Sequence, residues 1–294
     1  MAAVKVSAAV ARFGATAPGA KGRELRAGAI NALLDNGQLR YIRVNGVEVL
    51  RAIAWLVRDE NWGTFTPSLR NLRVKTTPEG FDVTYRATIG SGDRMLAYEA
   101  KIAANRKGTL EFTVECTPTG DFLTNRTGFI VLHPLQRVAG EKVNVEHVDG
   151  RKVKAKFPAL INPVQPFRNI RALTHEVMPG LTATCRMEGD SFEMEDHRNW
   201  MDASFKTYVR PLADPWPYVL KAGESFEQKV ILTLHGKIPR AARPKAGAVV
   251  TVSVGAAGRL RMPAIGPNSS AGGRLPGNRI SSETTAPHAW ANAA

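Results

Sequence analysis

Residues 185–208 (CRMEGDSFEMEDHRNWMDASFKTY) bring carboxylates, basic side chains and aromatic rings together in one polar-aromatic run. On a β-strand, Glu193 and Glu195 would point to the same face. Two like charges on one face would raise the pKa of one of them, which suits general acid–base catalysis. The alternative is a structural network in which basic residues such as Arg186 and Lys206 neutralise the two glutamates. The sequence leaves both interpretations open.

Aromatic side chains accompany these charges. Aromatic faces beside polar groups suit sugars, because a sugar presents both C–H faces and hydroxyl edges. The alternative is the ordinary packing of amphipathic rings where loops meet the core. The aromatic residues concerned are Trp62, Trp200, Tyr208, Trp216 and Tyr218.

The chain lacks the sequence patterns that are typical of metal, serine-hydrolase, phosphate and dinucleotide sites. His133, His147, His175 and His197 occur without H-E-x-x-H, H-x-H or Cys/His spacing, so we predict no metal site and no cofactor. The chain contains no G-x-S-x-G motif, phosphate loop or dinucleotide fingerprint. Residues 125–127 (Asn-Arg-Thr) match a glycosylation sequon, which means little without a secretory signal.

Composition narrows the class of protein. The net charge is +14, but residues 239–294 contribute +6 of it, and the remaining basic residues are scattered among acidic ones. No nucleic-acid-binding motif accompanies them, so we expect no nucleic-acid partner. Two distant cysteines argue against a disulfide scaffold and are compatible with a reducing compartment. Without a bilayer-length apolar stretch or a signal-type apolar region, we expect a cytoplasmic protein with no membrane partner.

Turn patterns predict an all-β fold. Asn36-Gly37 and Asn45-Gly46 are typical of two-residue hairpins and divide a predicted three-stranded meander over 29–34, 39–44 and 47–57. Turn residues recur about every ten residues, while helical periodicity is almost absent between residues 28 and 235. We predict a large antiparallel β-sandwich, with the mutarotase-like supersandwich as one form of it.

The same patterns divide the chain into segments. We predict a flexible N-terminal arm over 1–24, with one short helix around 4–13, and a β-sandwich domain over 25–236. Within it, the proline-punctuated stretch 152–177 is predicted to be an ordered loop. Residues 237–266 are predicted to be a linker and the start of a following domain. Residues 267–294 have no hydrophobic period, which predicts a disordered tail.

Several long segments together resemble the N-terminal part of the D-apionate lactonase family. They are LRYIRVNGVEVLRAIAWLVRDENWGT, DFLTNRTGFIVLHPL, VEHVDG, IRALTHEV, RMEGDSFEMEDHRNWMDASFKTYVRPL and PWPY. The resemblance covers roughly residues 25–265. It implies hydrolysis of the sugar lactone D-apionolactone to D-apionate in bacterial apiose catabolism. It also implies a longer protein, in which a TIM-barrel-like domain follows the β domain.

This sequence departs from the family pattern after GRLRMPAIG, where the Pro/Gly/Ser-rich tail replaces the expected barrel. We therefore expect a chain truncated before the barrel domain. Active sites of such barrels lie at the C-terminal ends of the barrel strands, so part of the catalytic centre is expected to be missing.

If this domain takes part in lactone hydrolysis, it must supply a base and a group that stabilises the oxyanion. The candidate bases are Glu193, Glu195 and His197, with Arg198 and Asn199 as oxyanion partners. Further candidates for contact with the sugar complete the predicted site: Trp200, Asp202, Tyr208 and His175.

Two other classes of function remain open. The first is a non-catalytic carbohydrate-binding or docking module. The second is a mutarotase-like sugar epimerase, which would pair His147 or His175 with Glu195 in one pocket.

Overall fold

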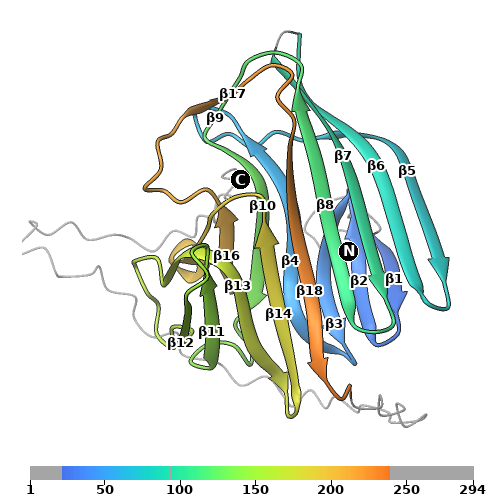
Figure 1. Ribbon diagram of the computed structural model, residues 1–294, viewed down its shortest axis with the longest axis vertical. Helices are drawn as coiled ribbons and strands as arrows, with labels where there is room; N and C mark the ends of the chain where they lie inside the picture. Colours follow the sequence, from blue (N-terminus) through green and yellow to red (C-terminus); the bar gives the residue numbers. More distant parts are fainter. Residues whose placement is uncertain (1–21, 93, 239–294) are drawn as a thin grey trace, which may run out of the picture. The chain divides into compact units, whose positions relative to one another are not determined.

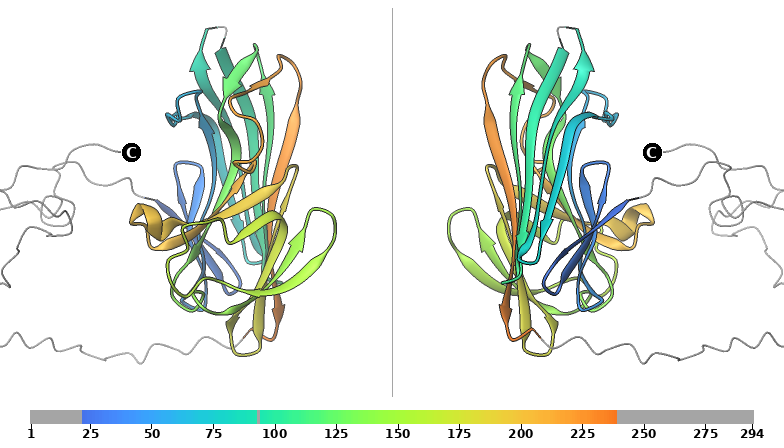
Figure 2. Two further views of the ribbon diagram at one scale, coloured as in Figure 1. Left: turned by 90° about the vertical axis from the view of Figure 1, so that its left-hand side faces the viewer. Right: turned by 90° about the vertical axis from the view of Figure 1, so that its right-hand side faces the viewer.

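The computed structural model describes residues 22–92 and 94–238, and these residues form a large antiparallel sheet that folds back on itself (Figure 1). The sheet has 16 strands, and its main hydrogen-bonded path runs β1-β2-β3-β4-β10-β16-β15-β13-β14-β18-β8-β7-β6-β5. Turned by 90°, its two halves lie face to face as layers (Figure 2). The predicted all-β antiparallel sandwich is therefore confirmed.

The hydrogen-bonded path divides into two halves, one for each layer. The first half contains β1 (Arg23–Ala27), β2 (Ile30–Asp35), β3 (Gln38–Val44), β4 (Val47–Arg58), β10 (Arg126–Pro134), β16 (Ser204–Val209) and β15 (Phe192–Asp196). The second half contains β13 (Phe167–Met178), β14 (Leu181–Glu188), β18 (Phe226–Gly236), β8 (Thr109–Pro118), β7 (Arg94–Asn105), β6 (Gly80–Ser91) and β5 (Ser68–Thr77). The remaining elements are β11 (Lys142–His147), β12 (Lys152–Lys156), β9 (Phe122–Thr124), β17 (Tyr218–Leu220) and the short 3-10 helix η1 (His197–Trp200).

The predicted Asn-Gly hairpins are present. Asn36 and Gly37 have φ angles of 47° and 80°, and Asn45 and Gly46 have φ angles of 50° and 85°. Positive φ at both central residues is the requirement of a type I′ turn. The predicted meander over 29–57 is therefore confirmed as β2, β3 and β4.

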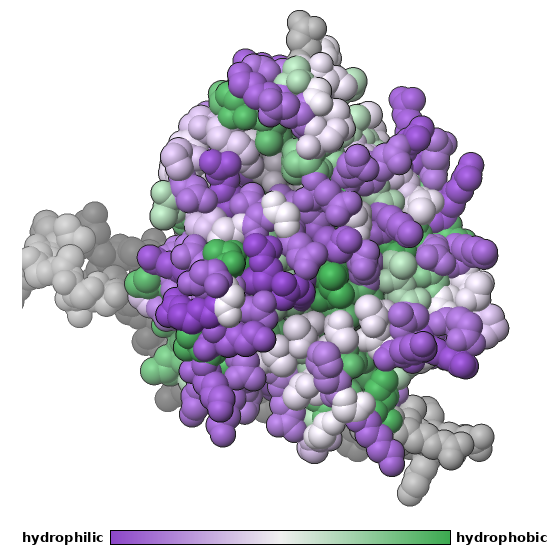
Figure 3. Space-filling view, viewed as in Figure 1, coloured by the Kyte–Doolittle hydropathy of each residue, from purple (hydrophilic) through white to green (hydrophobic). Residues whose placement is uncertain are grey.

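The core fills the space between the two layers. The ring of Trp55 on β4 lies 6.1 Å from the rings of Tyr98 and Phe226, which belong to the opposite layer. On β8 the residues predicted to share one face are all buried: Leu110, Phe112, Val114 and Cys116. The outward face of this second layer is mainly hydrophilic (Figure 3). This alternation of buried apolar and exposed polar residues is typical of an antiparallel sandwich.

One buried glutamine joins the layers through hydrogen bonds. Gln228 on β18 accepts a bond from the backbone N–H of Phe129 at 3.1 Å, and its amide nitrogen lies 3.5 Å from the carbonyl oxygen of Thr127. Gly128, between these two residues, has a φ of 146°, and a Cβ there would lie 2.2 Å from the Gln228 side-chain oxygen. The glycine therefore makes room for the glutamine.

The prediction of one loop over 152–177 is wrong. This stretch contains β12 and most of β13, and only the connection between these strands is irregular. Pro158, Pro163 and Pro166 all lie in that connection, where no ladder hydrogen bond is lost. The residues after them form β13, whose buried side chains include Ile170, Ala172 and Leu173 and pack the strand into the sheet.

Parts of the predicted organisation lie outside the described residues. They are the helix around 4–13, nearly all of the arm over 1–24, and the segments 239–266 and 267–294. By contacts, the chain divides into Met1–Arg243 and Pro244–Ala294, and the second unit lies wholly outside the described part. Within the described part, no helix is long and apolar enough to cross a membrane.

Replacing Gln228 with Leu should lower the free energy of unfolding by about 1–3 kcal/mol, because the buried N–H of Phe129 loses its acceptor. The control is Gln136→Leu, at an exposed position, which should change stability by less than about 0.5 kcal/mol. Urea denaturation followed by circular dichroism measures both variants. Equal midpoints for Q228L and the unmodified chain would contradict this role for Gln228.

Candidate functional site

The polar-aromatic run folds into β14, β15, η1 and β16, and the pairing of β15 with β16 places its charges. Glu193 lies opposite Tyr208, and Glu195 lies opposite Lys206. Directly opposed residues of an antiparallel pair share a face, so these side chains form one polar face. On the other face of β15, Phe192 and Met194 belong to the hydrophobic core, and Asp196 at the end of the strand is a buried carboxylate. The sequence prediction that Glu193 and Glu195 share a face therefore agrees with the structure.

Glu193 is buried and held by several donors. The hydroxyl of Tyr208 donates to its Oε1 at 2.6 Å, and the backbone N–H of Leu212 donates to the same oxygen at 3.3 Å. Arg168 Nε lies 3.8 Å from Oε2. Burial and the neighbouring Glu193 raise the pKa of Tyr208, so Tyr208 keeps its proton and acts as a donor.

Glu195 and Lys206 form a second cross-strand pair. Lys206 Nζ lies 2.7 Å from Glu195 Oε1, and both side chains are mostly buried. Burial lowers the pKa of Lys206, while the charge of Glu195 acts in the opposite direction. Glu195 also influences the pKa of His197, which burial lowers overall. The structure thus brings Glu195, Lys206 and His197 into one electrostatic neighbourhood.

His197 begins η1 and has two polar neighbours. Its Nδ1 lies 3.4 Å from Asp202 Oδ2 and 3.4 Å from Ser204 Oγ. The Ser204 hydroxyl also donates to Asp202 Oδ1 at 3.2 Å. A carboxylate beside a histidine nitrogen can fix the orientation of the ring and its tautomer.

Arg198 and Asn199 are bound to the protein itself. Arg198 makes two hydrogen bonds to Asp196, from Nε at 2.8 Å and Nη2 at 2.7 Å. It also donates to carbonyl oxygens of the β12–β13 connection: Pro158, Ala159 and Leu160. Asn199 donates to the carbonyl of Asn162 at 2.7 Å. These contacts anchor the loop 158–162 to η1.

Two predicted residues lie apart from the carboxylate pair. Trp200 is 71% exposed at the end of η1. His175 is buried on β13, where its ring lies 5.7 Å from the rings of His133 and Phe157. Among the described contacts, no hydrogen bond or ion pair joins His175 or His147 to Glu195; the Nδ1 of His147 instead lies 2.9 Å from the carbonyl oxygen of Arg168.

Sequence reasoning missed a cation that the fold places beside Tyr208. The guanidinium carbon of Arg126, at the start of β10, lies 3.9 Å from the centre of the Tyr208 ring and 5.2 Å from that of Trp62. Trp62 in turn meets Trp216 at 5.1 Å. In the sequence, Arg126 stands out only as the middle residue of the sequon 125–127. A charged residue leading into the apolar strand GFIVL is the feature of the sequence that could have identified it.

The family model for the N-terminal domain of D-apionate lactonase matches residues 10–237. The chain belongs to the D-apionate lactonase family. A D-apionate lactonase from Brucella anthropi is 49% identical over 223 residues, which are 76% of this chain and 37% of that protein. The match thus spans little more than a third of this relative's length.

Two solved structures are similar at low identity. A galactose 1-epimerase from Lactobacillus acidophilus NCFM is 9% identical, with a TM-score of 0.46 over 72% of this chain and 92% of that one. A protein from Synechocystis sp. PCC 6803 is 8% identical, with a TM-score of 0.49 over 76% of this chain and 98% of that one. At these values the similarity does not extend to site residues or to chemistry.

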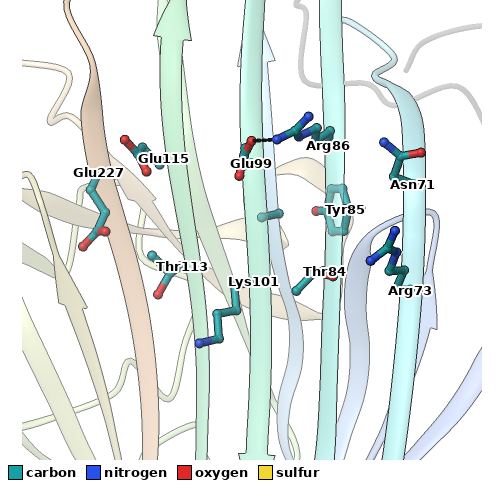
Figure 4. Close-up of a pocket in the computed structure, with 11 residues that line it drawn as sticks. Asn71, Arg73, Thr84, Tyr85, Arg86, Glu99, Lys101, Thr113, Glu115 and Glu227 are labelled. Carbon is teal, nitrogen blue, oxygen red and sulfur yellow. Dashed lines mark ion pairs between the residues drawn. The ribbon is translucent and has the colours of Figure 1, made fainter.

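A hollow of about 540 Å³ lies elsewhere on this family member, over the outward face of β5 to β8 and β18 (Figure 4). Its lining consists mainly of outward-pointing polar side chains, including the exposed ion pair of Arg86 with Glu99 at 2.7 Å. None of the predicted site residues lines it. Among residues 22–92 and 94–238, no three His, Cys, Asp or Glu side chains are grouped so as to hold a metal ion.

The buried histidines predict a pH-dependent stability. Burial lowers the pKa of His133 to about 3, with the nearby His175 contributing, and burial lowers the pKa of His175 to about 4. Unfolded histidine titrates near pH 6.5, so below that pH the unfolded state binds protons that the folded state does not. The free energy of unfolding is therefore highest above pH 6.5. It should fall by about 1.4 kcal/mol per pH unit for each histidine between roughly pH 6 and pH 5.

Urea denaturation at pH 7, 6 and 5 measures this slope. His133→Leu should reduce it by about 1.4 kcal/mol per pH unit, the contribution of one histidine, whereas His235→Leu, at an exposed position, should leave it unchanged. A slope that is the same with and without His133 would contradict the assignment.

Replacing Asp196 with Ala should release the loop 158–162, because Arg198 loses its two side-chain bonds and Asn162 N–H loses its acceptor. Hydrogen–deuterium exchange should be faster in that loop and unchanged in β5. Asp149→Ala, in the exposed turn between β11 and β12, is the matched control. Unchanged protection of the loop in D196A would show that other contacts hold it.

Proposed function

We propose that this chain is the N-terminal domain of an enzyme that hydrolyses D-apionolactone to D-apionate. The observation that carries the proposal is the 49% identity over 223 residues with the Brucella anthropi D-apionate lactonase. The match covers 37% of that relative, which leaves length for the barrel domain that the family resemblance implies. The two free, buried cysteines fit a reducing cytoplasm as the compartment.

Within this domain, Glu195 is the base. Glu193 already accepts bonds from Tyr208 and Leu212, whereas Glu195 is less buried and has a single described partner, Lys206. Glu195 takes a proton from a water molecule, and the hydroxide formed attacks the lactone carbonyl. The ring C–O bond then breaks, and the leaving alkoxide takes up a proton.

Lys206 is better placed than the predicted Arg198 and Asn199 to stabilise the oxyanion. The side chains of Arg198 and Asn199 already donate hydrogen bonds to Asp196 and to the loop 158–162. Lys206, by contrast, holds its ammonium group beside Glu195 on the polar face of β15 and β16. His197, oriented by Asp202, is the nearest alternative proton carrier. The exposed rings of Trp200 and Trp216 supply surfaces for the sugar.

A specific observation favours the second candidate, a non-catalytic sugar-recognition module. The charges of the run are neutralised internally, Glu195 by Lys206 and Asp196 by Arg198. In that case catalysis belongs to the following domain, and this domain only binds the lactone.

Hydrolysis of D-apionolactone by the purified 294-residue chain tests the proposal. We expect hydrolysis above the buffer rate, followed by proton release at constant pH. Glu195→Gln should lower kcat by about 100-fold or more, as expected for loss of a general base. Glu99→Gln, in the exposed ion pair on β7, is the matched control and should leave the rate unchanged.

Binding without hydrolysis would support the recognition module. Neither binding nor hydrolysis by a folded chain would contradict both candidates. Full activity in E195Q would remove Glu195 as the base while leaving the lactonase assignment intact.

A further inference from the structure

Arg126 is a buried cation without a carboxylate partner. Only 5% of the residue is exposed, and its Nε is buried with no hydrogen-bond acceptor. Among the described residues, no carboxylate oxygen lies within 4.0 Å of its guanidinium. An unpaired buried charge is costly, so such groups are normally paired or hydrogen-bonded.

Several other cations of the domain do have such partners, although Arg210, which stacks on Tyr218 at 3.8 Å, also has a buried Nε without an acceptor. Arg198 binds Asp196 at 2.7 Å, Lys206 binds Glu195 at 2.7 Å, and the more exposed Arg186 binds Glu146 at 2.8 Å. At other positions in the domain, a cation is thus paired with a carboxylate of the same chain. The neighbours of Arg126 are instead the rings of Tyr208 and Trp62.

Further positive charge surrounds Arg126. Arg58 on β4 lies directly opposite it in the register of β4 with β10, and like charges in directly opposed positions repel each other. Arg58 directs Nη1 to the carbonyl of Trp62 at 2.6 Å, which leaves its charge uncompensated. Lys206 lies on the same face, 5.6 Å from the centre of the Tyr208 ring. Glu195 is the carboxylate that acts on this group of cations.

The cations outnumber the carboxylate, and the group is bordered by aromatic rings. A guanidinium that contacts a ring through its face can still donate from its edge, and the Nε of Arg126 has no acceptor. The N–H groups along such an edge match the two oxygens of a carboxylate. The rings beside it offer faces to the C–H groups of a sugar. This combination suits a small anion that has a carbohydrate body.

We propose that Arg126, with Arg58 and Lys206 beside it and Trp62 and Tyr208 as walls, is a binding site for the carboxylate of a sugar acid. This inference rests on the proposed function, because a sugar acid is the product of lactone hydrolysis. The neutral lactone offers only uncharged oxygens to the same N–H edges, so the site binds the acid more tightly than the lactone. The domain is accordingly inhibited by its product.

Titration of the purified 294-residue chain with D-apionate tests this site. Trp62 contacts Arg126, so binding should change tryptophan fluorescence in a saturable manner. Arg126→Lys keeps the charge but loses the planar fork, and it should weaken binding by about tenfold or more. Arg86→Lys, on the exposed face of β6, is the matched control and should bind as the unmodified chain does.

A second variant and two further ligands keep the test decisive if R126K does not fold. Arg58→Gln should also weaken D-apionate binding several-fold. D-apiose, which lacks the carboxylate, should bind at least tenfold more weakly, and inorganic phosphate should compete only weakly. Phosphate binding as tight as that of D-apionate, or equal binding by R126K and the unmodified chain, would overturn the proposal.

The binding and hydrolysis measurements together distinguish failure of the Arg126 site from failure of the proposed lactonase function. Hydrolysis of D-apionolactone without saturable binding of D-apionate would overturn the Arg126 site and leave the lactonase assignment standing. Binding of D-apionate that depends on Arg126, in a chain without hydrolysis, would support the site and move catalysis to another domain.

Discussion

The register between β15 and β16 is the constraint on which the candidate site depends. It sets Glu193 opposite Tyr208 and Glu195 opposite Lys206, while Phe192 on the alternate face joins the core. A shift of one residue would exchange the two faces, so that the charged side chains would lose their partners and face the hydrophobic core. Packing of the apolar face into the core therefore determines which charged residues lie opposite each other. Because these residues pair with each other, they can be accommodated on strands that are largely shielded from solvent.

This pairing also explains the contrast between neutralised and unneutralised charges. Most ionised groups of the run are satisfied within the domain, as Arg198 is by Asp196. Arg126 differs because its neighbours are aromatic rings and another arginine, Arg58. The proposed role of this cation is to bind the carboxylate of a ligand, which would supply the charge that the described residues around it lack. In a family whose members include a D-apionate lactonase, a sugar acid fits both the charge and the rings.

Sequence alone could predict the fold class and part of the site. The Asn-Gly turns act locally, so the meander followed from the residues themselves, and the strand period placed Glu193 and Glu195 on one face. The strand β13 was missed because prolines confined to its connection masked the alternation that follows. Arg126 could not be predicted as a site residue, because its environment comes from Trp62 in a loop and Tyr208 on β16, which are remote in sequence and meet it only in the folded domain.

The most direct test is a crystal structure of this chain with D-apionate bound. We predict the carboxylate within hydrogen-bond distance of the Arg126 guanidinium, with the sugar carbons against Trp62. D-apionate bound instead on the outward face of β5 to β8, or absent from crystals at saturating concentration, would contradict the account.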